Sequence, residues 1–357
     1  MIIGQLVTGE KVHRYNKSIV INFSGKRKVL SNSPENGGMR GDLTAVFNND
    51  CTANREIDAS GYAEYILSLS RELELDPAKT AGMITAAQME NVSIKSVSYK
   101  DITVTAIVTG SLETNGGRVG DPASWDELAN EIVAEQGTIN IMLFINTNLT
   151  DGALTRALIT CTEAKTAAIQ ELMAPSKYSK GLATGSGTDS TIIVCNSESD
   201  TTLTDAGNHV KLGECIGKVV IGSVKEALKL QSGLCPVSQH DVFKRISRFG
   251  ITPKTLWNSF CEQSPSDIKE ARFTNILAIL KNDSTLVTGT SLYVHLLDQI
   301  TWGLIDLSEA DNYADSLLEK MSMSVVRSDE NKQNPTDFLT SKLELGLLNL
   351  IRDKADL

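Results

Sequence analysis

The side chains best suited to chemistry lie in a Gly-rich turn at residues 181–190. The second half of the turn combines two glycines with hydroxyl groups and one carboxylate, in Thr184, Gly185, Gly187, Thr188, Asp189 and Ser190. Because glycine adopts backbone angles that other residues resist, several N–H groups of the turn could converge on an anion or a polarised carbonyl. The turn lacks the Gly-Lys-Ser/Thr of a phosphate-binding loop, which argues against nucleotide hydrolysis. A plain connection before the next strand is the alternative interpretation.

Two residues outside the turn could transfer protons to or from it. A helix predicted over 151–173 places Lys165 in an apolar stripe, where an ammonium group must pair, reach out to water or lose its proton. His209 follows Gly207 and Asn208, and histidine is the residue type that ordinarily changes charge near neutral pH, although a histidine in such a place more often caps a helix or makes a hydrogen bond. We take His209 as the first candidate for proton transfer and Lys165 as its rival.

Three further polar segments could bind a ligand. They are two Asn-Gly-Gly loops and the cluster that follows residue 145, and their candidate binding residues are Asn36, Gly37, Gly38, Asn115, Gly116, Gly117, Arg118, Asp121, Asn146 and Asn148. The glycines make backbone N–H groups accessible, and Arg118 could clamp a carboxylate or pair with Asp121. Surface loops that merely connect other elements are the alternative for both Asn-Gly-Gly loops.

An apolar strand and a helix are expected to position these groups. The run 139–145 predicts a buried strand, and 191–195 predicts the strand that follows the Gly-rich turn. Thr150 or Asp151 can cap the helix between them. The end of the first strand and the Gly-rich turn are therefore expected to come to one place.

The first 232 residues as a whole predict a mixed α+β domain, in which helices cover a β-sheet. The expected elements are paired strands at 18–23 and 27–30, helices at 60–75 and 77–90, and a hairpin of 92–99 with 102–109. A doubly wound α/β sheet is the alternative, because the segment 139–195 demands a parallel crossover. Residues 233–357 predict a smaller all-α domain, with helices at 238–249, 253–261, 266–281, 292–305, 308–323 and 336–352.

Composition limits the classes of function. The chain has 357 residues, 41% of them hydrophobic, and its 34 basic and 44 acidic residues give a net charge of −10, which does not favour binding to nucleic acid. Its apolar stretches are far shorter than the roughly 18 residues of a membrane span, and its N-terminus turns polar too early for a signal peptide, so we expect a cytoplasmic protein without a membrane partner. Six cysteines without a C-x-x-C pair and four histidines without an H-E-x-x-H spacing predict reduced thiols and no protein-bound metal.

The chain resembles a known enzyme family. Over roughly residues 1–230, and in one collinear order, the stretches 140–165, 182–190 and 207–217 and both Asn-Gly-Gly loops are similar to the adenosylcobinamide amidohydrolase family (CbiZ). The resemblance implies hydrolysis of the amide that joins the aminopropanol arm to the corrin ring of adenosylcobinamide, which would release adenosylcobyric acid for cobamide salvage. It also implies a corrinoid substrate that brings its own cobalt, so no further cofactor is expected.

Amide hydrolysis gives roles to these candidates. The reaction needs a nucleophile or an activated water, an oxyanion stabiliser and an acid for the departing amine. Thr188, Asp189 and Ser190 could supply the first two, and His209 or Lys165 could move protons, while the identity of the attacking group stays open. The alternative functions are a corrinoid-binding or sensing module without catalysis and a peptidase-like hydrolase of small amides. The oligomeric state also stays open, with a homo-oligomer as one candidate.

Overall fold

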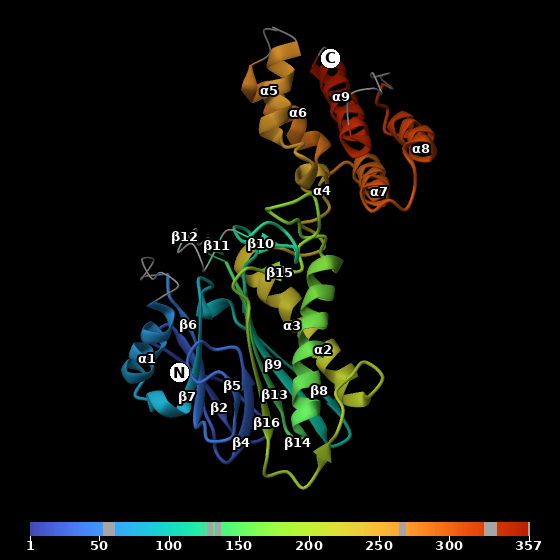
Figure 1. Cartoon of the computed structure of the whole chain (residues 1–357). Helices are drawn as coiled ribbons and strands as arrows, with labels where there is room; N and C mark the ends of the chain where they lie inside the picture. Colours follow the sequence, from blue (N-terminus) through green and yellow to red (C-terminus); the bar gives the residue numbers. More distant parts are fainter. Residues whose placement is uncertain are drawn as a thin grey trace. The chain divides into compact units, whose positions relative to one another are not determined.

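The computed structural model describes residues 1–52, 61–123, 125–126, 131–132, 137–263, 269–324 and 334–355, with the backbone alone at 125–126 and 131–132 (Figure 1). The chain divides into two compact units, residues 1–235 and 236–357. The helix α3 (Lys211–Ser232) ends at the residue after which the sequence placed the domain boundary. The first residues of the helix expected at 266–281 lie outside the described part of the chain.

The first unit contains two main β-sheets that stack face to face. The five-stranded sheet has the order β1-β2-β3-β6-β7, formed by β1 (Ile2–Gln5), β2 (Lys11–Tyr15), β3 (Ser18–Asn22), β6 (Ala45–Asp50) and β7 (Thr80–Thr85). The six-stranded sheet has the order β5-β4-β16-β13-β9-β8, formed by β4 (Arg27–Ser31), β5 (Gly38–Arg40), β8 (Ser93–Tyr99), β9 (Ile102–Gly110), β13 (Ile139–Ile145) and β16 (Ser190–Asn196). Within these sheets β6 pairs with β7, and β13 with β16, in parallel, and the other pairs are antiparallel. The mixed sheets and their helices confirm the α+β fold class.

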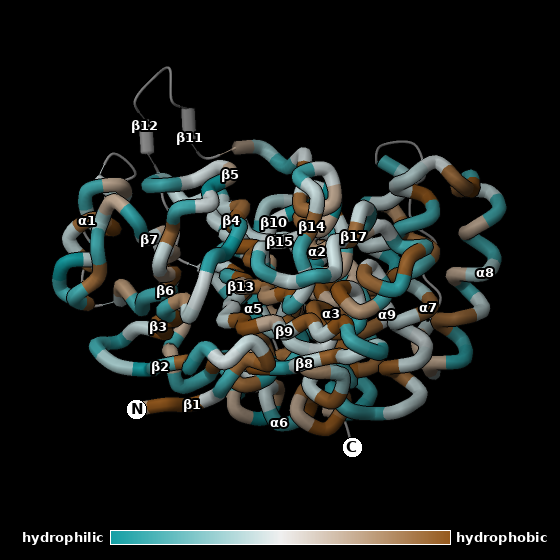
Figure 2. The backbone as a smooth tube through the Cα atoms, turned by 90° about the horizontal axis from the view of Figure 1, so that it is seen from below, coloured by the Kyte–Doolittle hydropathy of each residue, from teal (hydrophilic) through white to brown (hydrophobic). Residues whose placement is uncertain are grey.

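Helices cover the outer face of each sheet, which gives four layers. The helix α1 (Tyr62–Glu72) packs on the five-stranded sheet, and α2 (Asp151–Glu171) and α3 pack on the six-stranded sheet. The side chains of β13 alternate between the two layers beside it. Ile141 and Leu143 face α2 and α3, whereas Met142 and Phe144 face the other sheet. A strand covered on both faces is mostly apolar, and Figure 2 shows hydrophobic residues around β13, β9 and α3. The buried Asn140 of β13 bonds to the side chain of Asn48 in the other sheet.

Several local predictions around the central strand are confirmed. The strand predicted at 139–145 is β13, the hairpin predicted at 92–99 and 102–109 is β8 with β9, and the predicted helix and next strand are α2 and β16. Thr150 is the residue that caps α2, because its hydroxyl accepts the N–H of Ala153 at 3.3 Å. Local signals were therefore sufficient for the elements that carry the Gly-rich turn.

Two predictions for the first 90 residues are wrong. The strands at 18–23 and 27–30 do not pair, because β3 lies between β2 and β6 in the five-stranded sheet while β4 lies between β5 and β16 in the six-stranded sheet. Alternating hydrophobicity shows that a strand has a buried face but does not select its partner. The helix expected at 77–90 ends after one 3₁₀ turn at Pro77–Lys79, since the chain then enters β7 and pairs in parallel with β6.

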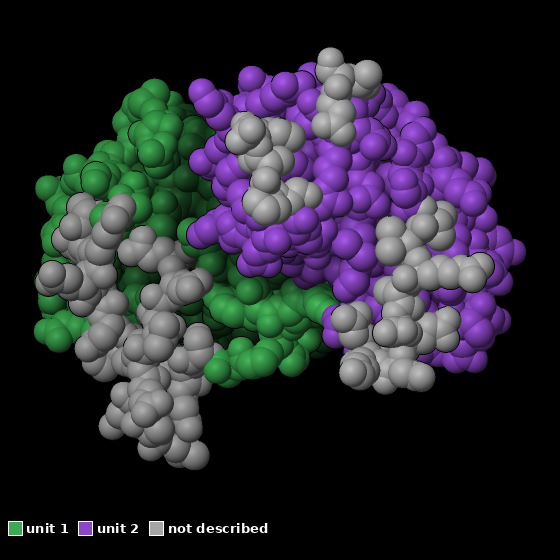
Figure 3. Space-filling view, turned by 90° about the horizontal axis from the view of Figure 1, so that it is seen from above, with its two compact units in different colours: residues 1–235 green, residues 236–357 purple. Residues whose placement is uncertain are grey.

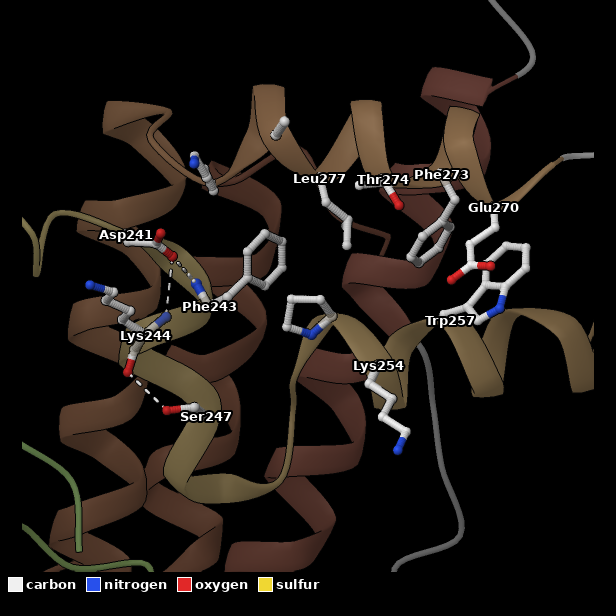
Figure 4. A pocket seen from close by; sticks show the side chains of 13 residues that line it. Asp241, Phe243, Lys244, Ser247, Lys254, Trp257, Glu270, Phe273, Thr274 and Leu277 are labelled. Atoms are coloured by element: carbon white, nitrogen blue, oxygen red, sulfur yellow. Dashed lines mark hydrogen bonds between the residues drawn. The ribbon is translucent and has the colours of Figure 1, made fainter. Parts of the chain in front are cut away.

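The second unit, coloured purple in Figure 3, contains helices and no β-strand among its described residues. Its helices are α4 (Val242–Ile246), α5 (Pro253–Gln263), α6 (Glu270–Leu280), α7 (Ser284–Thr301), α8 (Leu307–Lys320) and α9 (Pro335–Ala355). They enclose a hydrophobic core of their own. A cavity of about 670 Å³ lies between α4, α5 and α6 and is lined by Phe243, Trp257, Phe273 and Leu277 among others (Figure 4). Among the described helices of both units, none has the length and apolar character needed to cross a membrane.

Candidate active site

The structure brings two of the Gly-rich segments side by side. The short strand β10 (Gly116–Gly117) pairs antiparallel with β15 (Gly185–Ser186). The cause lies in the six-stranded sheet, where β9 runs antiparallel to β13 and ends at Gly110, opposite Ile139. The loop after β9 is thus delivered to the start of β13, and the turn before β16 reaches the same edge because β13 and β16 are parallel.

An ion pair between Lys165 on α2 and Asp189 in the turn forms the centre of this site. Only 12% of the lysine side chain and 11% of the aspartate side chain are exposed. The carboxylate of Asp189 also accepts hydrogen bonds from the N–H and the hydroxyl of Ser186, at 3.1 and 2.7 Å, and from the N–H of Ile139 at 2.8 Å. A carboxylate with these donors is held in one orientation, and it fixes the ammonium group in turn. Ser186 is a contact that the sequence did not single out.

Gly185 makes room for this ion pair. A Cβ atom at residue 185 would overlap the carboxylate and would lie 2.9 Å from Nζ of Lys165. Neither Gly185 nor Gly187 has a positive φ angle, so the expectation that these glycines supply special backbone angles is wrong. The N–H groups of Ser186 and Thr188 donate to side chains within the turn, at 3.1 and 3.4 Å, and therefore do not converge on a ligand. A glycine is required at residue 185 because a side chain there would displace the ion pair.

A cavity of about 680 Å³ opens beside the ion pair, a volume within the usual range for small-molecule sites. The predicted residues that line it come from α2 and both Gly-rich segments, and they are Asn115, Gly117, Arg118, Asp121, Lys165, Thr184, Gly185 and Gly187. Thr162, Thr166, Tyr178 and Ser186 also line it and were not predicted. Gly116 belongs to β10 at the same edge, and Asp189 acts on the cavity through Lys165.

Asp121 anchors the loop that forms one wall of the cavity. Its carboxylate accepts the backbone N–H of Arg118 at 2.8 Å and the hydroxyl of Ser176 at 2.6 Å. Burial by itself raises the pKa of Asp121, but hydrogen bonds from Ser176 and Ser179 and the charge of Arg118 outweigh it, and the pKa lies below its ordinary value. The predicted contact between Arg118 and Asp121 is thus made through the main chain of Arg118.

Two further predicted residues fasten the walls of the cavity to the segment before β13. The amide of Asn115 donates to the carbonyl of Gly137 at 3.0 Å and accepts the hydroxyl of Tyr178 at 2.8 Å. The hydroxyl of Thr188, a predicted catalytic group, donates to the same carbonyl of Gly137 at 2.9 Å. Thr188 is not part of the lining of the cavity, so the structure gives its side chain a supporting position.

Asn146 and Asn148 lie at the other end of β13, away from this cavity. Asn146 accepts the N–H of Thr103 at 2.7 Å and donates to the carbonyl of Asp101 at 2.8 Å. Asn148 donates to the hydroxyl of Thr202 at 3.0 Å. The expectation that the strand end and the Gly-rich turn meet is wrong, because in a parallel crossover the segment after the first strand and the segment before the second lie at opposite edges of the sheet.

His209 is an exposed residue before α3 and does not line the cavity. The segment that carries it is tied to α2 at Ala206, whose carbonyl accepts the hydroxyl of Thr160 at 2.9 Å. Thr160 precedes Lys165 by more than one helical turn. Of the two rival proton carriers, the structure therefore brings only Lys165 to the Gly-rich turn.

The remaining predicted binding residues make structural contacts. The side chain of Asn36 donates to the carbonyls of Pro77 and Thr80, at 2.7 and 2.8 Å, and so supports the turn before β7. Gly37 and Gly38 follow it and, like Asn36, are not in the lining of the cavity. The hydroxyl of Ser190, a predicted binding group, donates at 2.8 Å to the side chain of Asn32, a residue that the sequence analysis did not single out.

The described residues contain no group of three or more His, Cys, Asp or Glu side chains that could hold a metal ion. A cysteine does lie one helical turn before Lys165, but Cys161 is fully buried. Burial raises the pKa of Cys161 to about 12, against a smaller opposite effect of Lys165. Since the thiolate is the nucleophilic form, this thiol is a core residue and not an attacking group.

The fold and the site together define a class of protein. A fixed lysine and carboxylate at the wall of an open cavity is an arrangement suited to an enzyme that moves protons during the cleavage of a polar bond. The model of the family described as adenosylcobinamide amidohydrolase, CbiZ, matches residues 3–236. The chain belongs to this family, and it is an amidohydrolase that acts on a carbon–nitrogen amide bond.

Two relatives and one solved structure give the range of similarity. An uncharacterized protein of Methanocaldococcus jannaschii is 34% identical over 224 residues, which cover 59% of this chain and 86% of the relative. The adenosylcobinamide amidohydrolase of Methanosarcina mazei is 28% identical over 205 residues, which cover 55% of this chain and 88% of the relative. The crystal structure of the PH0078 protein from Pyrococcus horikoshii OT3 covers 64% of this chain and 81% of its own, at 11% identity and a TM-score of 0.29, and no fold assignment follows from it.

Proposed function

We propose that this protein hydrolyses the amide that joins the aminopropanol arm of adenosylcobinamide to the corrin ring, and releases adenosylcobyric acid for cobamide salvage. The family match over residues 3–236 and the relative in Methanosarcina mazei support this substrate. The observation that carries the proposal is the Lys165–Asp189 ion pair, which lies at the cavity where two Gly-rich segments meet. A cavity of about 680 Å³ suits the amide-bearing arm of a corrinoid.

Lys165 is the residue to which we assign proton transfer. Water adds to the amide carbon, the carbon–nitrogen bond breaks, and the departing amine must gain a proton. The ammonium group of Lys165 can donate a hydrogen bond to the carbonyl oxygen as negative charge develops there. It then transfers one proton to the amine nitrogen as the carbon–nitrogen bond breaks, and it regains one proton from the oxygen of the added water. Asp189 holds the ammonium group in place and is a positioning residue.

Water is the attacking group in this proposal because the predicted hydroxyls are engaged elsewhere. Thr188 donates to the carbonyl of Gly137, and Ser190 donates to Asn32. The hydroxyl of Ser186 donates to Asp189 and so supports the carboxylate. The reaction as proposed also needs no protein-bound metal, since the cobalt arrives with the substrate.

The test is to incubate the purified full chain with adenosylcobinamide and to identify both products by mass. Release of aminopropanol together with adenosylcobyric acid is the expected result. Binding of the corrinoid without release of aminopropanol would instead favour a corrinoid-binding module, and cleavage of simple peptides at a similar rate would favour a general small-amide hydrolase.

A chelator addresses the metal-free part of the proposal. Activity should survive dialysis against a strong chelator, because the proposed proton carrier and its partner are Lys165 and Asp189. A complete loss of turnover that added zinc restores would contradict this part and would require metal-bound water as the nucleophile.

A further inference from the structure

A second surface hollow adjoins the proposed active site on the outer face of α2. It has a volume of about 610 Å³ and is formed by α2 alone, from Leu158 to Gln170. It shares Thr162 and Thr166 with the catalytic cavity, so the two hollows form one continuous surface. Lys165 lies between these two threonines in the sequence, and its side chain lines the catalytic cavity.

Much of this surface is apolar, although the solvent-facing side of a helix that packs on a sheet is ordinarily polar. Ile159 is 44% exposed, and Leu158 and Ala167 lie beside it in the lining of the hollow. On the facing wall of the catalytic cavity, Val119 is 83% exposed. Exposed apolar residues that gather at the mouth of a cavity that holds an ion pair indicate a ligand with an apolar part outside that cavity.

We propose that the α2 hollow binds the corrin ring of the substrate while the amide arm reaches Lys165. This inference rests on the proposed function, because it takes the corrinoid as the ligand. A corrin is a flat macrocycle whose body is apolar and whose rim carries amide groups, and it is much larger than the arm that is cleaved. When the arm amide lies at the ion pair, the ring therefore has to rest on a surface outside the cavity, and the α2 hollow continues directly from it.

The polar residues of the hollow match the rim of such a ring. Glu163 and Gln170 carry acceptor and donor groups at its edge, and Thr162 and Thr166 stand at the border with the catalytic cavity. Amide groups at the rim of a corrin can both donate and accept hydrogen bonds with these side chains. The apolar side chains of Leu158 and Ile159 would contact the body of the ring.

The decisive variant is Ile159→Asp, which places a charge on the surface assigned to the ring. In steady-state assays with adenosylcobinamide, KM should rise about tenfold or more while kcat stays close to that of the parent protein. Val7→Asp is the matched control, because Val7 is 64% exposed in the turn between β1 and β2 and lines neither hollow. Ile159→Met keeps an apolar side chain on this surface and should keep KM near that of the parent protein.

A binding measurement separates this inference from the proposed function. Adenosylcobyric acid keeps the ring and carries a carboxylate where the arm amide was, and its dissociation constant can be measured by equilibrium dialysis. Ile159→Asp should weaken its binding about tenfold, and by the same factor when Lys165→Met is also present, because the ring contact does not depend on Lys165. If the parent protein releases aminopropanol and Ile159→Asp changes neither KM nor this constant, the ring site is wrong and the function stands. If the parent protein releases no aminopropanol but Ile159→Asp weakens corrinoid binding, the function is wrong and the ring site stands; a parent protein that binds no corrinoid overturns both.

Discussion

The two ends of β13 differ in what their polar residues do. At the start of the strand, where Asn140 lies opposite Ser190, the buried ion pair stands beside an open cavity. At the other end, beyond Ile145, the polar residues Asn146 and Asn148 bond to neighbouring segments of the sheet edge. Polar residues that follow a strand are therefore not by themselves a site.

The comparison also shows why the site lies at an unusual edge. In open sheets of parallel strands, ligands bind outside the carboxyl ends of the strands. Here the cavity lies at the amino ends of the parallel pair β13 and β16, and it is the antiparallel β9 that brings a loop there from its carboxyl end. A mixed sheet lets loops from both chain directions meet at one edge, and in this protein those are the two Gly-rich segments.

The largest expected effect comes from removing the ion pair. Lys165→Met and Asp189→Asn should each lower kcat by roughly a hundredfold or more, because one removes the proton carrier and the other the group that positions it. His209→Ala, a change at an exposed residue outside the cavity, is the control and should leave kcat nearly unchanged. The measurement is the rate of aminopropanol release under saturating substrate, with thermal unfolding as a check on the fold.

The opposite result would contradict the placement of the catalytic site at the start of β13. If His209→Ala abolished turnover while Lys165→Met kept it, the proton carrier would be the histidine. The catalytic centre would then lie on the side of the segment before α3, and the cavity at the start of β13 would have another role.

A smaller effect is expected from filling the space beside the ion pair. Gly185→Ala should lower kcat about tenfold, since the new Cβ overlaps a carboxylate that several donors hold in place and the ion pair has to shift. Gly187→Ala is the matched control in the same turn, because its Cβ would meet the amide of Asn115 at an ordinary 3.7 Å. Equal activities for the two variants would show that the space at residue 185 is not needed for catalysis.

The sequence predicted the elements of this site better than it predicted their arrangement. The apolar run of β13, the Thr150 cap of α2 and the apolar stripe around Lys165 are local signals, and each gave the right element or contact. The pairing of β10 with β15 joins residues far apart in the chain, and no local pattern specifies it. The strands at 18–23 and 27–30 were wrongly paired for the same reason, because alternating hydrophobicity does not specify which strands pair.

The candidate residues show the same division. Lys165 and Asp189 could be singled out from residue type and spacing, whereas the loop at 115–122 became a candidate through the family resemblance. The structure brings all three together. Ser186 could not be distinguished from the other hydroxyls of the turn, because its role depends on which side chain bonds to Asp189. His209 was favoured because it lies in a stretch that resembles the family and because histidine ordinarily titrates near neutral pH, and neither property shows where the side chain lies in the fold.

A substitution at the far end of β13 should lower the stability of the protein and leave its activity unchanged. Asn146→Ala removes the acceptor of the Thr103 N–H and the donor to the Asp101 carbonyl, and it should lower the free energy of unfolding by about 1 kcal/mol. Denaturant unfolding measures this loss, and kcat measured on the folded protein should equal that of the parent. A drop in kcat of tenfold or more with unchanged stability would place a functional group at this end after all.

The smallest effect on turnover is expected from removing the second unit. Residues 1–235 contain all the residues that line the catalytic cavity, and the family match ends at residue 236. The cores of this unit are built from its own strands and helices, so a protein that ends at residue 235 should fold alone and keep kcat within about threefold of the full chain. Thermal unfolding tests the folding, and aminopropanol release tests the turnover. A truncated protein that unfolds cooperatively yet releases no aminopropanol at any substrate concentration would mean that a residue beyond 235 completes the site, and the start of β13 would then hold only part of the catalytic centre.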